Sequence, residues 1–145
     1  MGTKLNVTAE LNDKYRVGTK VAGHEYVMDE PIDAGGDDTG TVPGAMLGVA
    51  LAGCKAMVAR VYADKCRIPL RKVEVEIEMD FEQTESGIDL AMNADIVIDG
   101  DLTEKQMEGM TKFLNEQCPV QKILSQPNKI TSTVSLKEPE LSAAA

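Results

Sequence analysis

The chain has few of the residues that build common catalytic and metal sites. Its 145 residues include no tryptophan, a single histidine and three cysteines. A structural zinc site needs four nitrogen or sulfur ligands at short spacings, and these scattered residues do not provide them. His24 has no cysteine or carboxylate at a triad spacing, which favours a surface strand or turn over a catalytic role. We therefore expect no metal and no cofactor.

Positive charge is also scarce. The chain carries 15 basic against 24 acidic residues, a formal net charge of −9. A nucleic-acid partner would need a basic patch to displace the counterions of the phosphate backbone, so the charge argues against one. The glycine-rich stretch at residues 33–40 is acidic and lacks the lysine of a phosphate-binding loop, which favours a solvated turn.

Long apolar runs are missing as well. The longest uncharged stretch, residues 40–53, covers about half of a membrane span. The first twenty residues contain no apolar segment typical of a signal peptide, and three cysteines do not make a disulfide framework. We therefore expect a cytoplasmic protein that makes no membrane contact. We expect one domain over residues 1–138 and a loose tail over residues 139–145.

The pattern of apolar residues that is present predicts an α+β fold. Three short strands come first, at residues 5–11, 15–21 and 25–28, and a loop follows at residues 29–43. The expected elements after this loop are a long helix (44–65), a strand hairpin (72–82 and 88–98), a helix that begins with a capping box at Thr103 and Gln106, a short helix (119–124) and a last strand (130–136). The order βββ-α-ββ-α-α-β implies a largely antiparallel sheet.

The long helix has a consequence for assembly. It is apolar on nearly every side as far as Cys54, and a helix without a polar face is buried on all sides. The strands of a chain this small do not provide that much cover. We therefore expect a homodimer with this helix at its centre.

Two cysteines are candidates for chemistry. Cys118 precedes Pro119, which is favoured at the first position of a helix, so Cys118 is the expected N-cap of the short helix. The free N–H groups and the dipole at that end favour a thiolate and a lowered pKa. The alternative is a buried apolar cysteine that continues the stripe ending at Leu114, and position leaves both open. Cys54 lies where a core cysteine is common, and Cys66 is expected to be structural.

Several short stretches together carry a resemblance to a known family. They are DEP (29–31), GG-D-x-x (35–39), PGAMLGVALAGC (43–54) with the following MVARVYADK, KVEVEIEMD (72–80) and CPVQKIL (118–124). In this combination the chain resembles the OsmC/Ohr family of thiol peroxidases from about Tyr15 to Leu136. The most specific parts are the two cysteine contexts and the spacing between them.

The resemblance implies a two-cysteine peroxidase of oxidative or osmotic stress defence. Cys54 would be the peroxidatic thiolate that attacks an organic hydroperoxide, or hydrogen peroxide, and becomes a sulfenic acid. Cys118 would resolve it as an intramolecular disulfide. A dithiol, lipoyl-linked in some members, would then reduce the disulfide. The family is similar in being an intertwined homodimer with each active site near the subunit interface.

The chain departs from the family at the groups that activate the thiol. The family's glutamate falls where this chain has Gly44 and Ala45, and the family's arginine is missing from residues 29–43. Arg16 is the favoured substitute cation, and Glu25 or Glu30 the substitute carboxylate. The other cations considered are Lys20, Lys55 and Arg60, the last of which projects from a different helical face than Cys54.

Two other functions stay open. The absence of the family's glutamate and arginine favours a binding or regulatory module, which would use an apolar pocket between subunits and would have no efficient turnover. A Cys-Pro at a helix N-terminus also resembles persulfide carriers, which would make the protein a sulfur-handling one. Those carriers usually have a second proline where this chain has Gln121.

Overall fold

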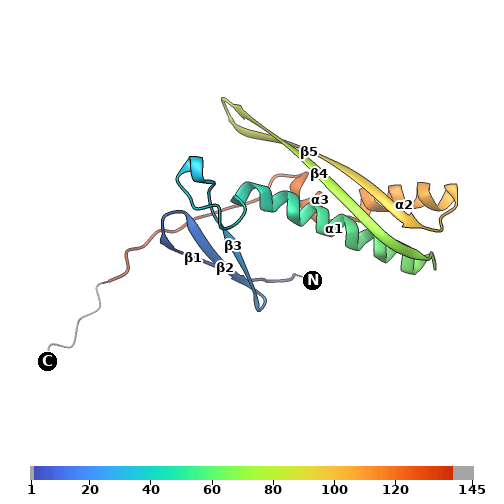
Figure 1. Cartoon of the computed structure of the whole chain (residues 1–145), viewed down its shortest axis with the longest axis horizontal. Coiled ribbons are helices and arrows are strands. Elements are labelled where there is room, and N and C mark those ends of the chain that lie inside the picture. Colours follow the sequence, from blue (N-terminus) through green and yellow to red (C-terminus); the bar gives the residue numbers. More distant parts are fainter. Residues whose placement is uncertain (1, 139–145) are drawn as a thin grey trace.

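A computed structural model of the chain describes residues 2–138 and confirms an α+β fold with antiparallel sheets (Figure 1). The strands form two separate sheets, one of three strands and one of two. In chain order the elements are β1 (Val7–Asp13), β2 (Arg16–Val21), β3 (His24–Met28), a 3-10 turn η1 (Ile32–Ala34), α1 (Pro43–Lys65), β4 (Leu70–Thr84), β5 (Gly87–Gly100), α2 (Glu104–Gln117) and α3 (Pro119–Leu124).

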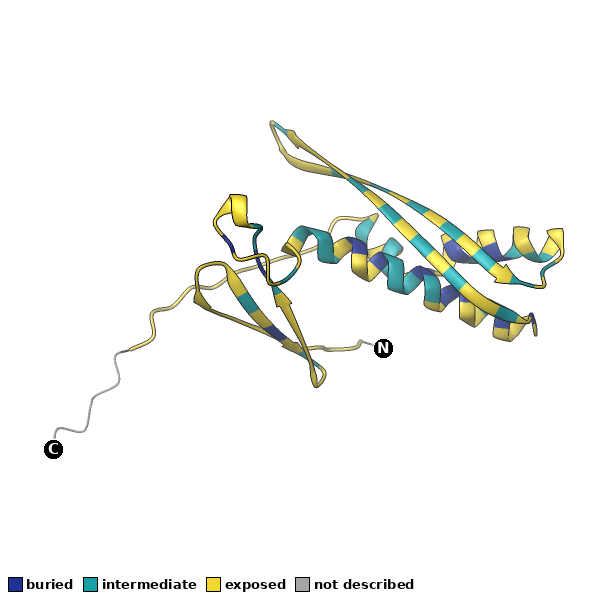
Figure 2. Cartoon of the chain, in the orientation of Figure 1, coloured by how far each residue is buried: buried dark blue, intermediate teal, exposed yellow. Residues whose placement is uncertain are grey.

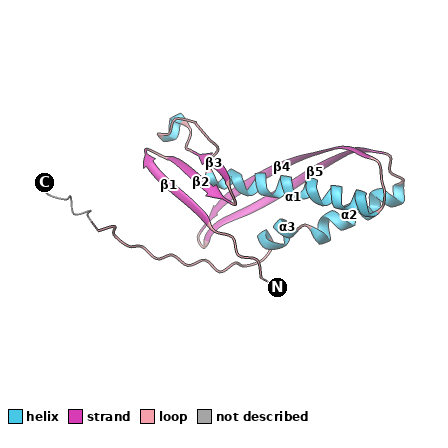
Figure 3. Cartoon of the chain, turned by 90° about the horizontal axis from the view of Figure 1, so that it is seen from below, coloured by secondary structure: helices cyan, strands magenta, loops and turns pink. Residues whose placement is uncertain are grey.

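The three-stranded sheet is a meander in the order β1-β2-β3. Lys14 has a positive φ of 44° in the first turn, and the second turn uses Ala22 and Gly23 at φ values of 49° and 80°. Two successive residues with positive φ match the twist of antiparallel strands in a tight hairpin. The sheet lies beyond the N-terminal end of α1, away from α2 (Figures 1 and 3).

The β4–β5 hairpin, α2 and α3 pack on α1. Alternate β4 residues such as Val73, Val75 and Ile77 are half-buried, whereas the glutamates between them are exposed, as the alternation predicts. Gly48 lets α1 approach the sheet closely, because a Cβ there would meet the Met79 sulfur at 2.5 Å. The hairpin crosses α1 obliquely, while α2 and α3 lie along its side (Figures 1 and 3).

The core forms on only one face of α1. Its members are Leu51, Val58, Ala59, Ala63, Ile68, Met110, Leu114 and Cys118. The prediction that α1 is buried on all sides is wrong for the single chain, because Leu47, Val49, Met57 and Val61 are exposed, Met57 to 72% (Figure 2). The described elements of one chain do not reach that face.

By length and composition alone α1 is apolar enough to cross a membrane, with a mean hydropathy of 1.4 in its most apolar window. The uncharged run 40–53 is shorter than the apolar part of α1, because the apolar pattern continues past Lys55. Lys55 is buried, and β4, α2 and α3 all contact the helix. These contacts make α1 the core helix of this fold.

The predicted last strand at residues 130–136 is not formed. Within the described part of the chain, no regular element follows α3. The segment extends away from the helices, with Ile130, Val134 and Leu136 exposed to 87%, 94% and 96% (Figure 1). A strand needs a neighbouring strand for its N–H and C=O groups, and the described chain offers none there. The predicted tail at residues 139–145 lies outside the described residues.

The loop before α1 is built around one buried carboxylate. Asp29 accepts hydrogen bonds from the Thr39 hydroxyl at 2.6 Å, the Thr39 N–H at 3.1 Å and the Glu30 N–H at 2.8 Å. Gly36 is required because a Cβ there would overlap the Glu30 carbonyl. Residues 33–40 are mostly exposed, as expected of a solvated turn, but Asp29 fixes their path. The pKa of Asp29 is lowered, mainly by the hydrogen bond from the Thr39 hydroxyl. Burial of the carboxylate acts in the opposite direction and raises this pKa.

We expect Asp29→Asn to lower the midpoint of urea unfolding at pH 7, because the amide cannot accept the same set of N–H and O–H donors. The folded pKa is lowered, so the stabilisation is present above the ordinary value of 3.8 and is lost as the pH falls through the folded value. The difference between the two proteins should therefore shrink in acid. Asp33→Asn is the control, and a pH-independent difference would contradict the assignment.

Candidate active site

The fold brings together two cysteines that lie 64 residues apart in the chain. Cys54 is on α1 and is half-buried, and Cys118 is fully buried between α2 and α3. Their Sγ atoms are 3.2 Å apart, and both thiols are free. A disulfide bond is about 2.05 Å long, so about 1 Å of movement would join them.

Local sequence signals place Cys118 at this point. The predicted capping box is present, with the Gln106 N–H donating to the Thr103 hydroxyl and the Gln106 amide accepting from the Thr103 N–H. At the other end of α2, Cys118 is extended, with φ −74° and ψ 110°, as expected of a residue before proline. It is the N-cap of α3, as predicted, and also the buried end of the α2 apolar stripe, so both predicted environments occur together.

The pKa of the Cys54 thiol is raised, and burial is the largest cause. The backbone N–H of Val120, in the first turn of α3, acts in the opposite direction by donating to the sulfur. The Cys118 sulfur raises the Cys54 pKa, and the nearby Lys55 charge lowers it. The first turn of α3 therefore donates a hydrogen bond to the sulfur of Cys54.

Lys55 is the buried cation of the site. It is only 3% exposed, and its Nζ donates to the Leu114 carbonyl at 2.9 Å and to the Gln121 side-chain oxygen. Leu114 lies four residues before Cys118, and Gln121 lies three residues after it. Lys55 therefore ties α1 to both helices that flank the second thiol.

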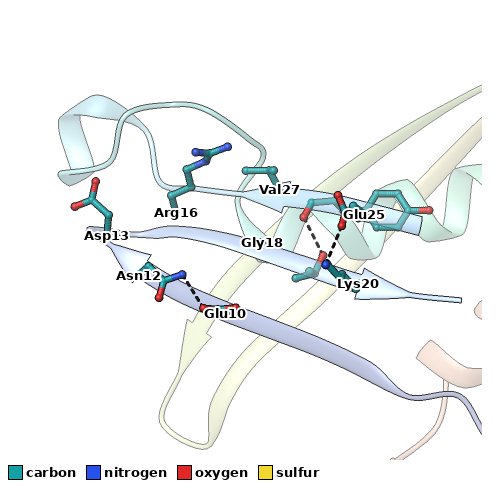
Figure 4. Close-up of a pocket in the computed structure, with 10 residues that line it drawn as sticks. Glu10, Asn12, Asp13, Arg16, Gly18, Lys20, Glu25 and Val27 are labelled. Atoms are coloured by element: carbon teal, nitrogen blue, oxygen red, sulfur yellow. Dashed lines mark hydrogen bonds and ion pairs between the residues drawn. The ribbon is translucent and has the colours of Figure 1, made fainter. Parts of the chain in front are cut away.

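The other predicted partners lie elsewhere in the chain. Arg16 is exposed on β2, where it lines a hollow on the three-stranded sheet with Glu10, Asp13 and Glu25 (Figure 4). Glu25 pairs with Lys20 at 3.0 Å. The Glu30 backbone belongs to the Asp29 loop. Within one chain these groups are not among the main influences on Cys54, and their catalytic roles stay predictions.

A family model described as OsmC-like protein matches residues 35–133, which is more than half of the chain. The chain belongs to the OsmC-like family. No curated protein sequence matches it. An OsmC-like protein from Mycoplasma pneumoniae has the same fold at 22% identity and a TM-score of 0.76, over 86% of this chain and 89% of that one.

Two further solved structures share the fold of this OsmC-like chain. An organic hydroperoxide resistance protein OsmC from Legionella pneumophila is 20% identical with a TM-score of 0.67, over 84% of this chain and 89% of its own. An organic hydroperoxide resistance protein from Elizabethkingia anophelis, with thiocyanate bound, is 16% identical with a TM-score of 0.67, over 85% and 89%.

Sequence reasoning named Lys55 of this OsmC-like chain as a candidate cation but favoured Arg16 and did not predict that Lys55 is buried. The signal was present, because Lys55 follows Cys54 inside a run that is apolar on nearly every side. A lysine in such a run is either exposed through its long stem or buried against acceptors, and the burial of its neighbours favours the second. The third thiol, Cys66, is exposed at the end of α1. The pKa of Tyr62 is raised, mainly by burial of the tyrosine and to a smaller extent by Cys66.

We expect Lys55→Met to raise the pKa of Cys54, because the Lys55 charge stabilises the thiolate. In a Cys66→Ser, Cys118→Ser background, the rate of Cys54 alkylation by iodoacetamide should rise with pH through a midpoint that lies higher in the variant. Lys112→Met, on the exposed face of α2, is the control. An unchanged or lower midpoint would exclude an electrostatic effect of Lys55 on this thiol.

Proposed function

We propose that the protein is a thiol peroxidase that reduces organic hydroperoxides by a two-cysteine mechanism. The observation that carries this proposal is the 3.2 Å separation of two free sulfurs from distant parts of the chain. Membership of the OsmC-like family, which includes proteins named for organic hydroperoxide resistance, supports it. Hydrogen peroxide would be a second substrate, and the working compartment would be the reducing cytoplasm.

In the first step the Cys54 thiolate attacks the distal oxygen of the hydroperoxide. The O–O bond breaks, the alkoxide takes up a proton to leave as the alcohol, and Cys54 becomes a sulfenic acid. The two-electron oxidation of sulfur balances the two-electron reduction of the peroxide. The Val120 N–H and the Lys55 charge, which lower the Cys54 pKa, both favour the attacking thiolate.

In the second step Cys118 attacks the sulfenic sulfur of Cys54. An S–S bond forms, the S–O bond breaks, and the oxygen leaves as water with the thiol proton of Cys118 and the sulfenic proton. A dithiol, which we propose to be lipoyl-linked, restores the two thiols by exchange and becomes a disulfide itself. The full burial of Cys118 keeps it from bulk oxidants until Cys54 is oxidised.

Stoichiometric cumene hydroperoxide should remove two hydrogens from the wild-type protein, as measured by intact mass. Cys118→Ser should gain one oxygen at Cys54, which dimedone then labels, because the sulfenic acid has no resolving thiol. Cys54→Ser should consume peroxide at least about 100-fold more slowly, because the nucleophile is absent.

Cys66→Ser is the matched control and should behave as the wild type. Unchanged thiols at stoichiometric peroxide would reject the peroxidase and leave a binding module. A persulfide mass on the purified protein would instead indicate sulfur handling.

We also propose a homodimer that covers the outer face of α1. The exposed side chains of that face are Leu47, Val49, Met57 and Val61. Burying each of them would contribute roughly 1.5–3 kcal/mol, which together is enough to offset much of the cost of association. The uncovered apolar residues of the three-stranded sheet and of residues 130–136 point to exchange of these segments between subunits.

Sedimentation equilibrium at micromolar concentration should therefore give a dimer. Val49→Glu combined with Met57→Glu should weaken the dimer by roughly 100-fold or more, because a carboxylate would have to be buried without a partner. Lys105→Glu, on the exposed side of α2, is the control and should leave the mass unchanged. A monomeric wild-type protein would contradict this assembly.

A further inference from the structure

A cavity of about 430 Å³ is lined by residues of α1, β5, α2 and α3. Neither Cys54 nor Cys118 lines it. Its walls are Leu51, Lys55, Leu90, Met92, Asn93, Ala94, Asn115, Gln121, Leu124 and Ser125. A cavity of this size lies within the range of pockets that bind small organic molecules.

The charge of Lys55 has no counter-charge. An ammonium group has three N–H donors, and Lys55 uses two of them on neutral oxygens, the Leu114 carbonyl and the Gln121 amide. No carboxylate of residues 2–138 lies within ion-pair distance of its Nζ. A buried charge is costly unless it is paired, and Lys55 lines the cavity, so an anion is favoured as its occupant.

The lining combines polar groups, which make up the larger part of its surface, with four apolar side chains. Among residues 2–138 no acidic side chain lines this cavity, and Lys55 is the one charged residue of its wall. The polar wall residues are Asn93, Asn115, Gln121 and Ser125, whose amide and hydroxyl groups supply further donors. The apolar walls come from Leu51, Leu90, Met92 and Leu124.

We propose that this cavity binds an aliphatic monocarboxylate, with its carboxylate on Lys55 and its chain against the leucine and methionine walls. The third N–H of Lys55 donates to a carboxylate oxygen, and this charge-assisted bond supplies the counter-charge that residues 2–138 do not provide. Neither thiol lines the site, although Lys55 also lowers the pKa of Cys54. It stands independently of the proposed peroxidase, because binding requires no oxidation of either thiol.

Isothermal titration of the reduced full-length protein with octanoate, without peroxide, tests the site. Octanoate should bind, and octan-1-ol and acetate should bind at least about tenfold more weakly, because each lacks one of the two features that the cavity matches. Equal binding of octanoate and octan-1-ol would overturn the proposal, as would no octanoate binding at all.

Two variants locate the binding. Lys55→Met should weaken octanoate binding at least about tenfold, because it removes the charge and keeps a side chain of similar length. Gln121→Glu should do the same while keeping Lys55, because it places a carboxylate of the chain on the ammonium, and it should raise the thermal midpoint. Lys122→Met, an exposed neighbour on α3, should bind as the wild type. Undiminished binding in Gln121→Glu would overturn the assignment to Lys55.

Discussion

The structure depends on the need to cover α1. A 23-residue helix with so little polar surface cannot remain in water on every side. The β4–β5 hairpin, α2 and α3 cover one face, and their packing decides where everything else lies. Because α2 and α3 must both lie along α1, the break between them falls opposite the middle of that helix. Cys118 sits at this break and Cys54 at the facing position, so covering the helix also assembles the pair of thiols.

The same cover creates the electrostatic character of the site. Burial removes water from Cys54 and raises its pKa. The backbone N–H of Val120 and the buried ammonium of Lys55 lower it. Lys55 is held by acceptors on α2 and α3, so its position depends on the same packing that brings the sulfurs together. A loss of packing between α1 and the two helices α2 and α3 would both separate the sulfurs and expose the Lys55 ammonium to water. The geometry of the site therefore depends on the contact of α3 with α1.

Features that depend on local sequence were predictable. The alternation in β4, the capping box at Thr103 and the extended Cys118 before Pro119 each follow from interactions within a few residues, and all three are present. The last strand was predicted wrongly, because alternation identifies a segment suited to a sheet but does not supply the neighbouring strand. The acceptors of Lys55 lie about 60 residues away in the chain. No local pattern identifies contacts at that distance.

The raised pKa of Cys54 is the main tension between this structure and peroxidase chemistry. The groups of one chain that lower it, the Val120 N–H and Lys55, do not outweigh burial. A further cation near the sulfur would change this balance, and Arg16 is exposed on a sheet whose apolar residues are themselves uncovered. In the proposed dimer that covers both α1 and this sheet, further loss of water would raise the Cys54 pKa, and a cation such as Arg16 would have to outweigh that increase to activate the thiol. On this argument the activation of Cys54 depends on the charges that surround its sulfur as well as on the pair of cysteines.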